Sequence, residues 1–363
     1  MAVRTMAHSI PDVLKAFAAG EIVVVTDDDD REGEGDLIVA ASLCTPEKMA
    51  FIVRHTSGIV CAPVTSEDAR RLRLDPMVAH NDSNYSTAFT VSIDYKPGMT
   101  TGISAEERTA TCRALVNSNV GPNDLARPGH IFPLIARDGG VLLRSGHTEA
   151  AIDLCRLSGL PLVGVLSELM NDDGTVMKGA QVAAFAQKHN LKQLTIAELI
   201  AYRQAREKLI ERVSSFVVDS PIGPLEGHAY RSPFDSIYHL ALVYGNIGDG
   251  KNVLTRFHKP NIVKDLFGGP LKVVKALDHF KKRKSGVLVY LRDGAAGVPV
   301  EPLADQSSVD ADRNRQWREV GVGAQILRDL GVSSICNLSS SVHEYKGLSG
   351  FGIEIAGSEP FEG

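Results

Sequence analysis

Residues 23–41 read VVVTDDDDREGEGDLIVAA. The stretch begins with an apolar run typical of a buried strand, passes through the consecutive aspartates 27–30, and returns to apolar residues at Leu37. Because like charges repel, such a block is usually a solvated loop or a disordered tail. The apolar flanks, Arg31 and two glycines set this stretch apart, since glycine lets the backbone turn sharply or approach a ligand closely.

Two kinds of cation site can be compared with this loop. A calcium-binding EF-hand that starts at Asp28 fails, because its twelfth position falls on Val39, where a bidentate Glu is required. The remaining possibility is a carboxylate-rich loop that binds a hard cation such as magnesium through one or two oxygens, with the substrate supplying others. From these residues alone, the magnesium loop and the solvated loop both stay open.

Length and composition describe an ordinary globular protein. The chain has 363 residues, 44% hydrophobic and 23% charged, which is enough for two domains and a sizeable core. A net charge of -5 gives no indication of nucleic-acid binding, and no apolar run is as long as a membrane span. The start of the chain lacks the apolar segment of a signal peptide, and the 5 cysteines are scattered without CxxC spacing. We therefore expect a cytoplasmic protein without a structural zinc site, bound to neither membrane nor nucleic acid.

Helix and strand signals alternate through the N-terminal part. Ser9 followed by Pro11 and an apolar stripe predicts a capped helix, and Ser104 with Glu107 has the pattern of a capping box. A helix that begins at Thr195 is expected to run to about Arg212.

Composition then changes. Residues 214–231 show shorter apolar runs and hairpin signals, which places a domain boundary near residues 205–213.

The stretch RSGHT, residues 144–148, is predicted to follow a strand and to open a helix. The first backbone N–H groups of a helix lack internal partners and, together with the helix dipole, favour a phosphate. Arg144 adds a forked cation, Thr148 adds a hydroxyl, and His147 can ligate a metal or move protons near neutral pH. A capped helix start with a surface histidine explains the same residues, so both interpretations stay open.

Two further residues are candidates for proton transfer. His130 lies in RPGHIFPL, residues 127–134, where Pro128 and Pro133 predict a rigid, irregular loop. Glu168 lies near the end of the apolar strand LVGVLSEL, where burial would suit a general acid or base. A structural turn histidine and an exposed strand-end glutamate are the alternatives.

Together these stretches describe a site that could enolise a small phosphorylated sugar, with a cation, a phosphate pocket and groups that move protons. In chain order, DDDDREGEGD, TGISAEER, RPGHIFPL, RSGHTEA and SELMNDDG resemble the motifs of 3,4-dihydroxy-2-butanone 4-phosphate synthase over about residues 6–205. The resemblance implies a lyase that converts D-ribulose 5-phosphate to L-3,4-dihydroxy-2-butanone 4-phosphate and formate in riboflavin biosynthesis. It also implies Mg2+ or Mn2+, two divalent ions per site with substrate, and a homodimer with the active site at the subunit interface.

The resemblance also implies roles for individual residues. Glu32 and His147 correspond to the metal ligands, and His130 and Glu168 to the two positions essential for proton transfer. Glu107 stands where the family pattern has Asp, which keeps the charge. The expected substrate-binding residues are Arg31, Glu32, Asp36, Cys61, Thr111, Arg144, Ser145, Gly146, His147, Thr148 and Glu168.

The second half resembles the GTP cyclohydrolase II domain in WREVGVGAQILRDLGV, residues 317–332, and in YKGLSGFGIEI, residues 345–355. The zinc site of that family needs three cysteines, whose places fall on Asn261 and about on Lys272 and Val274. Without thiolate ligands, we expect no zinc.

We therefore expect a catalytically inactive second domain with a structural, dimerising or regulatory role. One alternative is a bifunctional enzyme that also hydrolyses GTP. Another is a module that binds a nucleotide or a partner protein, which the basic stretch HFKKRKSG, residues 279–286, would favour unless it is a solvated face.

The expected fold class is α+β. Residues 1–208 are predicted to form a three-layer α/β/α domain with a mixed sheet, of the synthase type. Residues 209–363 are predicted to form a second α+β domain of the GTP cyclohydrolase II type.

Overall fold

The structure, a computed structural model, describes most of the chain. The described residues are 9–27, 32–83, 85, 87–208, 210–231, 237–261, 263, 265, 272–292, 321–339, 348 and 352–361. Arg31, aspartates 28–30 and parts of the stretches 317–332 and 345–355 therefore lie outside the described residues. The described chain divides into two compact units between Tyr202 and Arg203. Within the described part, no helix has the length and apolar character needed to cross a membrane.

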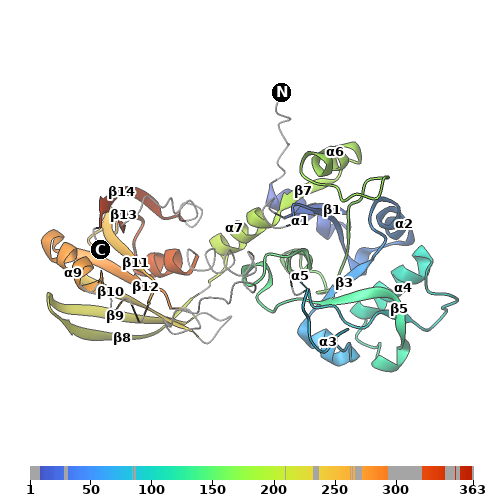
Figure 1. The fold of residues 1–363 in the computed structure, drawn as a ribbon, viewed down its shortest axis with the longest axis horizontal. Helices are drawn as coiled ribbons and strands as arrows, with labels where there is room; N and C mark the ends of the chain where they lie inside the picture. The colour runs from blue at the N-terminus through green and yellow to red at the C-terminus, as the bar shows by residue number, and fades with distance from the viewer. Residues whose placement is uncertain are drawn as a thin grey trace. The chain divides into compact units, whose positions relative to one another are not determined.

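The first unit is built on a seven-stranded mixed sheet in the order β4-β5-β3-β6-β2-β1-β7 (Figure 1). β1 and β2 are antiparallel neighbours, and Thr26 lies opposite Gly35, so the acidic loop connects two adjacent inner strands. The strands are β1 (Val23–Thr26), β2 (Gly35–Ala40), β3 (Cys61–Val64), β4 (Ile93–Tyr95), β5 (Leu125–Ile135), β6 (Gly164–Glu168) and β7 (Lys192–Thr195).

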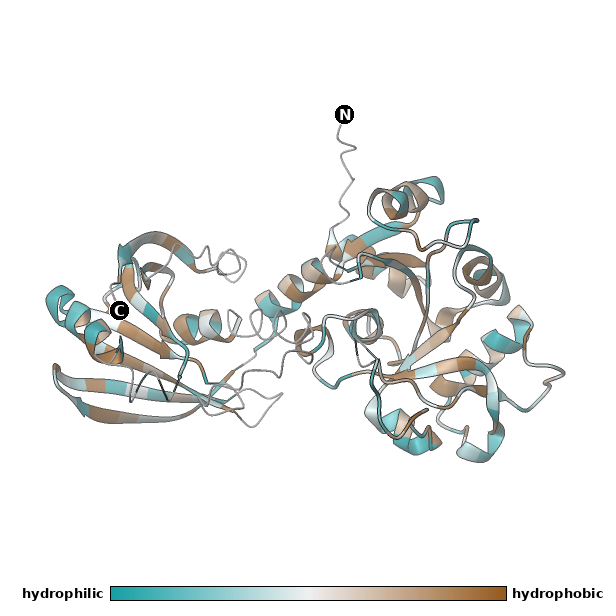
Figure 2. Ribbon diagram, viewed as in Figure 1, coloured by the Kyte–Doolittle hydropathy of each residue, from teal (hydrophilic) through white to brown (hydrophobic). Residues whose placement is uncertain are grey.

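Helices cover both faces of this sheet. α1 and α5 pack on each other and against β1 and β2. Val24, Leu37 and Val39 share one apolar core with residues of α2, α3, α4 and α6, whereas their immediate neighbours along each strand point to the other face. Apolar residues accordingly follow the strands (Figure 2). The predicted three-layer arrangement is confirmed. The helices are α1 (Ile10–Ala18), α2 (Pro46–His55), α3 (Ser66–Leu72), α4 (Ala105–Val116), α5 (His147–Leu157), α6 (Ala180–Lys188) and α7 (Ile196–Arg206), with 3-10 turns at η1 (Ala41–Leu43), η2 (Pro122–Asp124) and η3 (Gly140–Leu142).

The predicted helix starts are confirmed. The side chain of Ser9 accepts the N–H of Asp12 at the start of α1, and Ser104 forms the reciprocal capping box with Glu107 at the start of α4.

Two predicted elements differ. The apolar residues before RSGHT form the 3-10 turn η3 rather than a strand, because the N–H of Val141 donates to the Asp153 carboxylate of α5 instead of to a neighbouring strand. The helix expected to reach Arg212 ends at Arg206, since Arg212 is paired with Tyr230 inside a hairpin.

The second unit contains another seven-stranded mixed sheet, in the order β14-β13-β11-β12-β10-β9-β8. The predicted hairpin is formed by β8 and β9, and α9 (Lys272–Arg283) lies on one face through Phe280. Ile326, in the helical residues 321–329, packs into the core on the other side of the strands. The second α+β domain is confirmed. Its strands are β8 (Glu211–Ser220), β9 (Gly223–Arg231), β10 (Tyr238–Gly245), β11 (Val253–His258), β12 (Ser285–Tyr290), β13 (Ser334–Ser339) and β14 (Glu354–Pro360).

Candidate active site

The described part of the acidic loop is organised by Asp27, which follows β1 and is only 7% exposed. Its two carboxylate oxygens accept the backbone N–H groups of Glu32, at 3.1 Å, and Glu34, at 2.9 Å. Gly33 lies between them with φ +66°, a left-handed conformation that favours glycine. The loop therefore turns back at Gly33 and brings the Glu32 side chain toward the end of β1.

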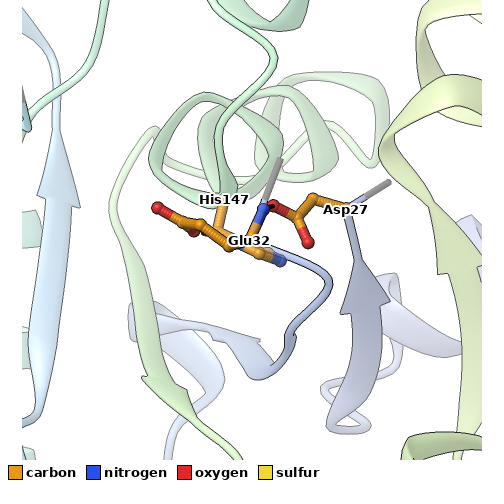
Figure 3. A group of neighbouring side chains, drawn as sticks. All are labelled: Asp27, Glu32 and His147. Atoms are coloured by element: carbon orange, nitrogen blue, oxygen red, sulfur yellow. Dashed lines mark hydrogen bonds and ion pairs between the residues drawn. The ribbon is translucent and has the colours of Figure 1, made fainter. Parts of the chain in front are cut away.

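Three potential ligands meet at this place (Figure 3). One atom each of Asp27, Glu32 and His147 lie within 4.8 Å of one another. His147 is the first residue of α5 and is buried, so the cluster joins the acidic loop to the N-terminus of that helix. Two carboxylates and an imidazole form a donor set suited to a divalent cation.

Charge around this cluster is predominantly negative. Asp36, in β2, is buried, with Oδ2 3.9 Å from His147 Nδ1, and its Oδ1 has no hydrogen-bond partner among the described residues. Burial, and then the nearby carboxylates of Glu168 and Glu32, raise the pKa of Asp36 well above its ordinary value. Lys178 brings positive charge close, with Nζ 3.8 Å from the Glu34 carboxylate. The number of carboxylates gathered here fits a site that gains a divalent cation.

Of the two environments that the sequence left open for Glu168, the structure shows the exposed one. Glu168 ends β6 with its side chain exposed, while Ser167 before it is buried, because successive residues of a strand point to opposite faces. Glu168 is paired with Asp36 across β2 and β6. Burial raises the pKa of the nearby Cys61 thiol, and the Asp36 and Glu168 carboxylates raise it further, which keeps the thiol protonated. The structure thus brings Cys61, Asp36 and Glu168 together from three adjacent strands.

The N-terminus of α5 carries the RSGHT stretch. Gly146 is the cap and makes no side-chain capping bond, and Ser145, His147 and Thr148 are buried around it. A β-carbon at Gly146 would lie 2.3 Å from Arg144 Nη1, so the guanidinium lies directly against the helix start.

Arg144 is held in that position by protein groups. Its guanidinium donates to Glu149 Oε2 at 2.7 Å, to Thr87 Oγ1 at 3.0 Å and to the Tyr85 carbonyl at 3.2 Å. Glu149 is 1% exposed, and its other oxygen accepts the N–H of Arg137 at 3.0 Å. The Arg144 guanidinium is therefore fixed beside the first N–H groups of α5 by the buried Glu149 carboxylate. The sequence analysis missed Glu149, although it lies in RSGHTEA.

His130 lies within β5 and not in the irregular loop that its prolines suggested. Ile131 is opposite Ile93 and Ala126 is opposite Asp94, so residues 127–130 bulge out between two paired positions. Because β5 pairs with β4 on both sides of the bulge, residues 127–130 remain part of the sheet despite the prolines in this stretch.

Asp94 is the second residue that the sequence analysis missed. It is 3% exposed, and its carboxylate accepts the His130 backbone N–H at 2.9 Å and lies 2.7 Å from His130 Nδ1. A carboxylate at the end of STAFTVSIDY was the available signal. The next residue, Tyr95, donates its N–H to the buried hydroxyl of Thr111, at 2.9 Å, so Thr111 supports the same end of β4.

Comparison with known proteins agrees with this fold. The family model for 3,4-dihydroxy-2-butanone 4-phosphate synthase matches residues 11–202, and that for GTP cyclohydrolase II matches residues 211–360. A two-domain 3,4-dihydroxy-2-butanone 4-phosphate synthase from A. baumannii, RibBX, has a TM-score of 0.80 at 37% identity, covering 96% of this chain and 99% of its own. A 3,4-dihydroxy-2-butanone 4-phosphate synthase in complex with two magnesium ions has a TM-score of 0.54 at 46% identity, covering 55% of this chain and 98% of its own.

Two curated relatives from Arabidopsis thaliana are each 43% identical and cover 97% of this chain. One is a monofunctional riboflavin biosynthesis protein, RIBA 2, matched over 76% of its length, and the other is a bifunctional one, RIBA 1, matched over 68%.

The fold and the carboxylate–histidine cluster define a metal-dependent carbon–carbon lyase of riboflavin biosynthesis. The chain belongs to the 3,4-dihydroxy-2-butanone 4-phosphate synthase family, with a GTP cyclohydrolase II-like domain following the synthase domain.

Proposed function

We propose that the first unit converts D-ribulose 5-phosphate to L-3,4-dihydroxy-2-butanone 4-phosphate and formate. The observation that carries this proposal is the cluster of Asp27, Glu32 and His147, whose ligand atoms lie within 4.8 Å of one another beside the N-terminus of α5. A divalent cation bound there, Mg2+ or Mn2+ and two per site with substrate, would stabilise the negative charge that develops on the sugar oxygens. Glu32 and His147 would hold it, with Asp27 completing the set.

The remaining residues bind substrate and move protons. The first N–H groups of α5, with Arg144 and Thr148, would hold the phosphate, since a helix start and a fixed guanidinium both attract an anion. Arg31, Asp36, Cys61, Thr111, Ser145 and Gly146 complete the proposed substrate-binding set.

His130 and Glu168 are proposed to transfer protons. Asp94 holds His130 through its ring nitrogen, and the Glu168 side chain is exposed, so both side chains are available for proton transfer. The side-chain types are those of general acid–base chemistry, and no step is assigned to one residue.

Formate release from ribulose 5-phosphate tests this proposal on the full chain. We expect turnover with Mg2+, none with EDTA, and at least about 100-fold weaker metal binding in Glu32→Gln, because even groups outside the ligand shell change affinity by about 10- to 100-fold. Glu106→Gln is a matched control, since Glu106 is exposed on α4. Metal-dependent formate release at the same rate from Glu32→Gln as from the control would overturn the assignment.

For the second domain we propose the absence of GTP cyclohydrolase activity, and a boundary between the domains at residues 208 and 209. No cysteine lies between Cys155 and Cys336, which leaves no thiolate set for a catalytic zinc. Asn261 stands at one of the three expected cysteine positions and donates its backbone N–H to the Asp265 carboxylate at 2.8 Å.

Zinc content and GTP turnover of the purified protein test this assignment, and stoichiometric zinc with GTP hydrolysis would contradict it. Calorimetry with GTP separately tests the alternative of a nucleotide-binding module. We also propose that the chain is a homodimer, as the family resemblance implies, which sedimentation would measure.

A further inference from the structure

Helix α4 packs against β4 and β5, the strands that carry Asp94 and His130 (Figure 1). The hydroxyl of Thr111, on α4, accepts the N–H of Tyr95, the residue after Asp94, at 2.9 Å. Arg108 stands three positions before Thr111 and therefore lies on the same face of the helix. The Asp94 carboxylate attracts its guanidinium. Helix α4 thus presents an arginine to the Asp94–His130 pair.

The tip of the Arg108 side chain lies near the end of β6, which carries Glu168. Arg108 Nη1 donates to the carbonyl of Gly58 at 3.4 Å. The residue before Gly58, Ser57, donates its N–H to the Glu168 carbonyl at 2.9 Å. The guanidinium is therefore close both to the backbone that contacts Glu168 and to the carboxylate that holds His130, the two proposed proton-transfer residues.

Arg108 is buried while most of its hydrogen-bond donors are unused. The residue is 7% exposed, and Nε is fully buried without a hydrogen-bond partner among the described residues. Within the same part of the chain, Nη2 is neither fully buried nor bonded, and no carboxylate forms an ion pair with the guanidinium. Burial lowers the pKa of Arg108 against the opposing effects of Cys112 and Asp94. The loss of water therefore outweighs the stabilisation that neighbouring groups provide.

A purely structural role does not account for this arrangement. A buried guanidinium stabilises a fold when carboxylates or several carbonyls satisfy its donors, because removing the charge from water is costly. The bond from Arg108 to Gly58 goes to a neutral carbonyl and is longer than the ordinary range of about 2.7–3.2 Å. Gly58 is only partly buried, so water can satisfy its carbonyl without the arginine. The unused donors suit an oxygen that arrives with a ligand.

We propose that Arg108 is a further substrate-binding residue, whose free N–H donors bind an oxygen of the sugar. This role rests on the lyase function proposed above, because that function supplies the sugar. The phosphate already has a site at Arg144 and the start of α5, which leaves the sugar oxygens for Arg108. Negative charge develops on these oxygens when a neighbouring proton is removed, and a guanidinium binds an oxyanion more tightly than a neutral oxygen. Arg108 therefore acts mainly on the rate of the reaction.

Arg108→Met in the full chain tests this role, with Arg113→Met as the matched control. Met keeps an apolar stem without the guanidinium, and Arg113 is exposed on the same helix. With Mg2+ we expect kcat for formate release to fall at least about tenfold in Arg108→Met, because a bond to a charged group is lost, and to stay within about twofold in Arg113→Met. Arg108→Lys keeps the charge but not the fork, so it should recover only part of the loss. The Mg2+ dissociation constant should be the same in all three variants.

Thermal melting without metal or substrate separates substrate binding from a structural role. Because Arg108→Met removes an unpaired buried charge, its melting temperature should equal or exceed that of Arg113→Met. A lower melting temperature in Arg108→Met would overturn the proposal whatever its rates, since the guanidinium would then serve the fold. A kcat equal to that of Arg113→Met would overturn it as well. Absence of formate release from wild type and Arg113→Met alike would instead reject the lyase function, and with it the sugar as the ligand of Arg108.

Discussion

Replacing Asp94 by Asn tests whether the Asp94–His130 contact positions a proton-transfer group. Asn has almost the same volume, and its oxygen can still accept the His130 backbone N–H, which lies 2.9 Å from Asp94 Oδ1. The amide NH2 would then face His130 Nδ1, now 2.7 Å from Asp94 Oδ2. Since an amide NH2 donates and does not accept, Nδ1 must become the acceptor and the ring proton must move to Nε2. The variant keeps the shape of the site and changes the tautomer.

The magnitude follows from the burial of the two partners. A hydrogen bond to a charged group contributes about 1.5–3 kcal/mol. Asp94 is 3% exposed, but the His130 side chain is 39% exposed, so solvent screens part of the interaction and favours the lower half of that range. About 1.5–2 kcal/mol corresponds to a loss of roughly 10- to 30-fold in kcat, at about 1.4 kcal/mol per factor of ten.

Steady-state formate release, with metal affinity measured separately, is the assay. We expect kcat to fall in Asp94→Asn while KM and the Mg2+ dissociation constant stay within about twofold, and Asp94→Glu to recover much of the loss because it restores a carboxylate. In the His130→Ala background, Asp94→Asn should cause no further loss, since the carboxylate acts through the imidazole. A kcat near wild type in Asp94→Asn, or an equal additional loss without His130, would refute the reasoning.

Three other outcomes are expected. Glu149→Gln should raise the KM for the phosphorylated substrate about 10-fold with little change in kcat, because Arg144 loses its buried counter-charge. A loss confined to kcat in initial-rate assays would contradict this expectation. Without metal, Asp36→Asn should melt at a higher temperature than wild type at pH 7. Because the pKa of Asp36 is raised in the folded protein, the wild type loses stability as the pH rises from the ordinary value of 3.8 to the raised pKa, by about 1.4 kcal/mol for each unit of the pKa shift. Below pH 3.8 the difference in melting temperature between Asp36→Asn and wild type should vanish. Mg2+ at 100 times its dissociation constant should stabilise wild type by about 2.7 kcal/mol in thermal melts, and an equal gain in Glu32→Gln would place the ion elsewhere.

Local signals in the sequence predicted much of the fold. The caps at Ser9 and Ser104 depend on side chains that bond to backbone only three residues away, so adjacent residues suffice to identify them. The apolar residues that form η3 were wrongly predicted as a strand because a short apolar run does not reveal its partner. In the folded chain that partner is Asp153, 12 residues later, for the N–H of Val141.

The site residues were predictable where a single sequence motif carries the chemistry. They were less predictable where two segments distant in the sequence come together in the fold. Glu32 and His147 are 115 positions apart, and only the family resemblance linked them before the structure placed them together. Asp94 was missed because its significance depends on contact with His130, across strands β4 and β5. The sequence left the exposure of Glu168 open, because a register shift of one residue exchanges the two faces of a strand, and its neighbour Ser167 is the buried one.

Crowding of carboxylates in the acidic loop has a physical explanation in the cation site. Two charged carboxylates 4.8 Å apart, the upper limit for Asp27 and Glu32, repel by about 3.5 kcal/mol at an effective dielectric constant of 20. Backbone N–H groups offset part of this for Asp27, and Asp36 responds through its raised pKa. A divalent cation adds an attraction to each of these carboxylates, and this attraction outweighs their mutual repulsion. The carboxylates of Asp27, Glu32 and Asp36 therefore destabilise the metal-free protein and stabilise the metal-loaded one.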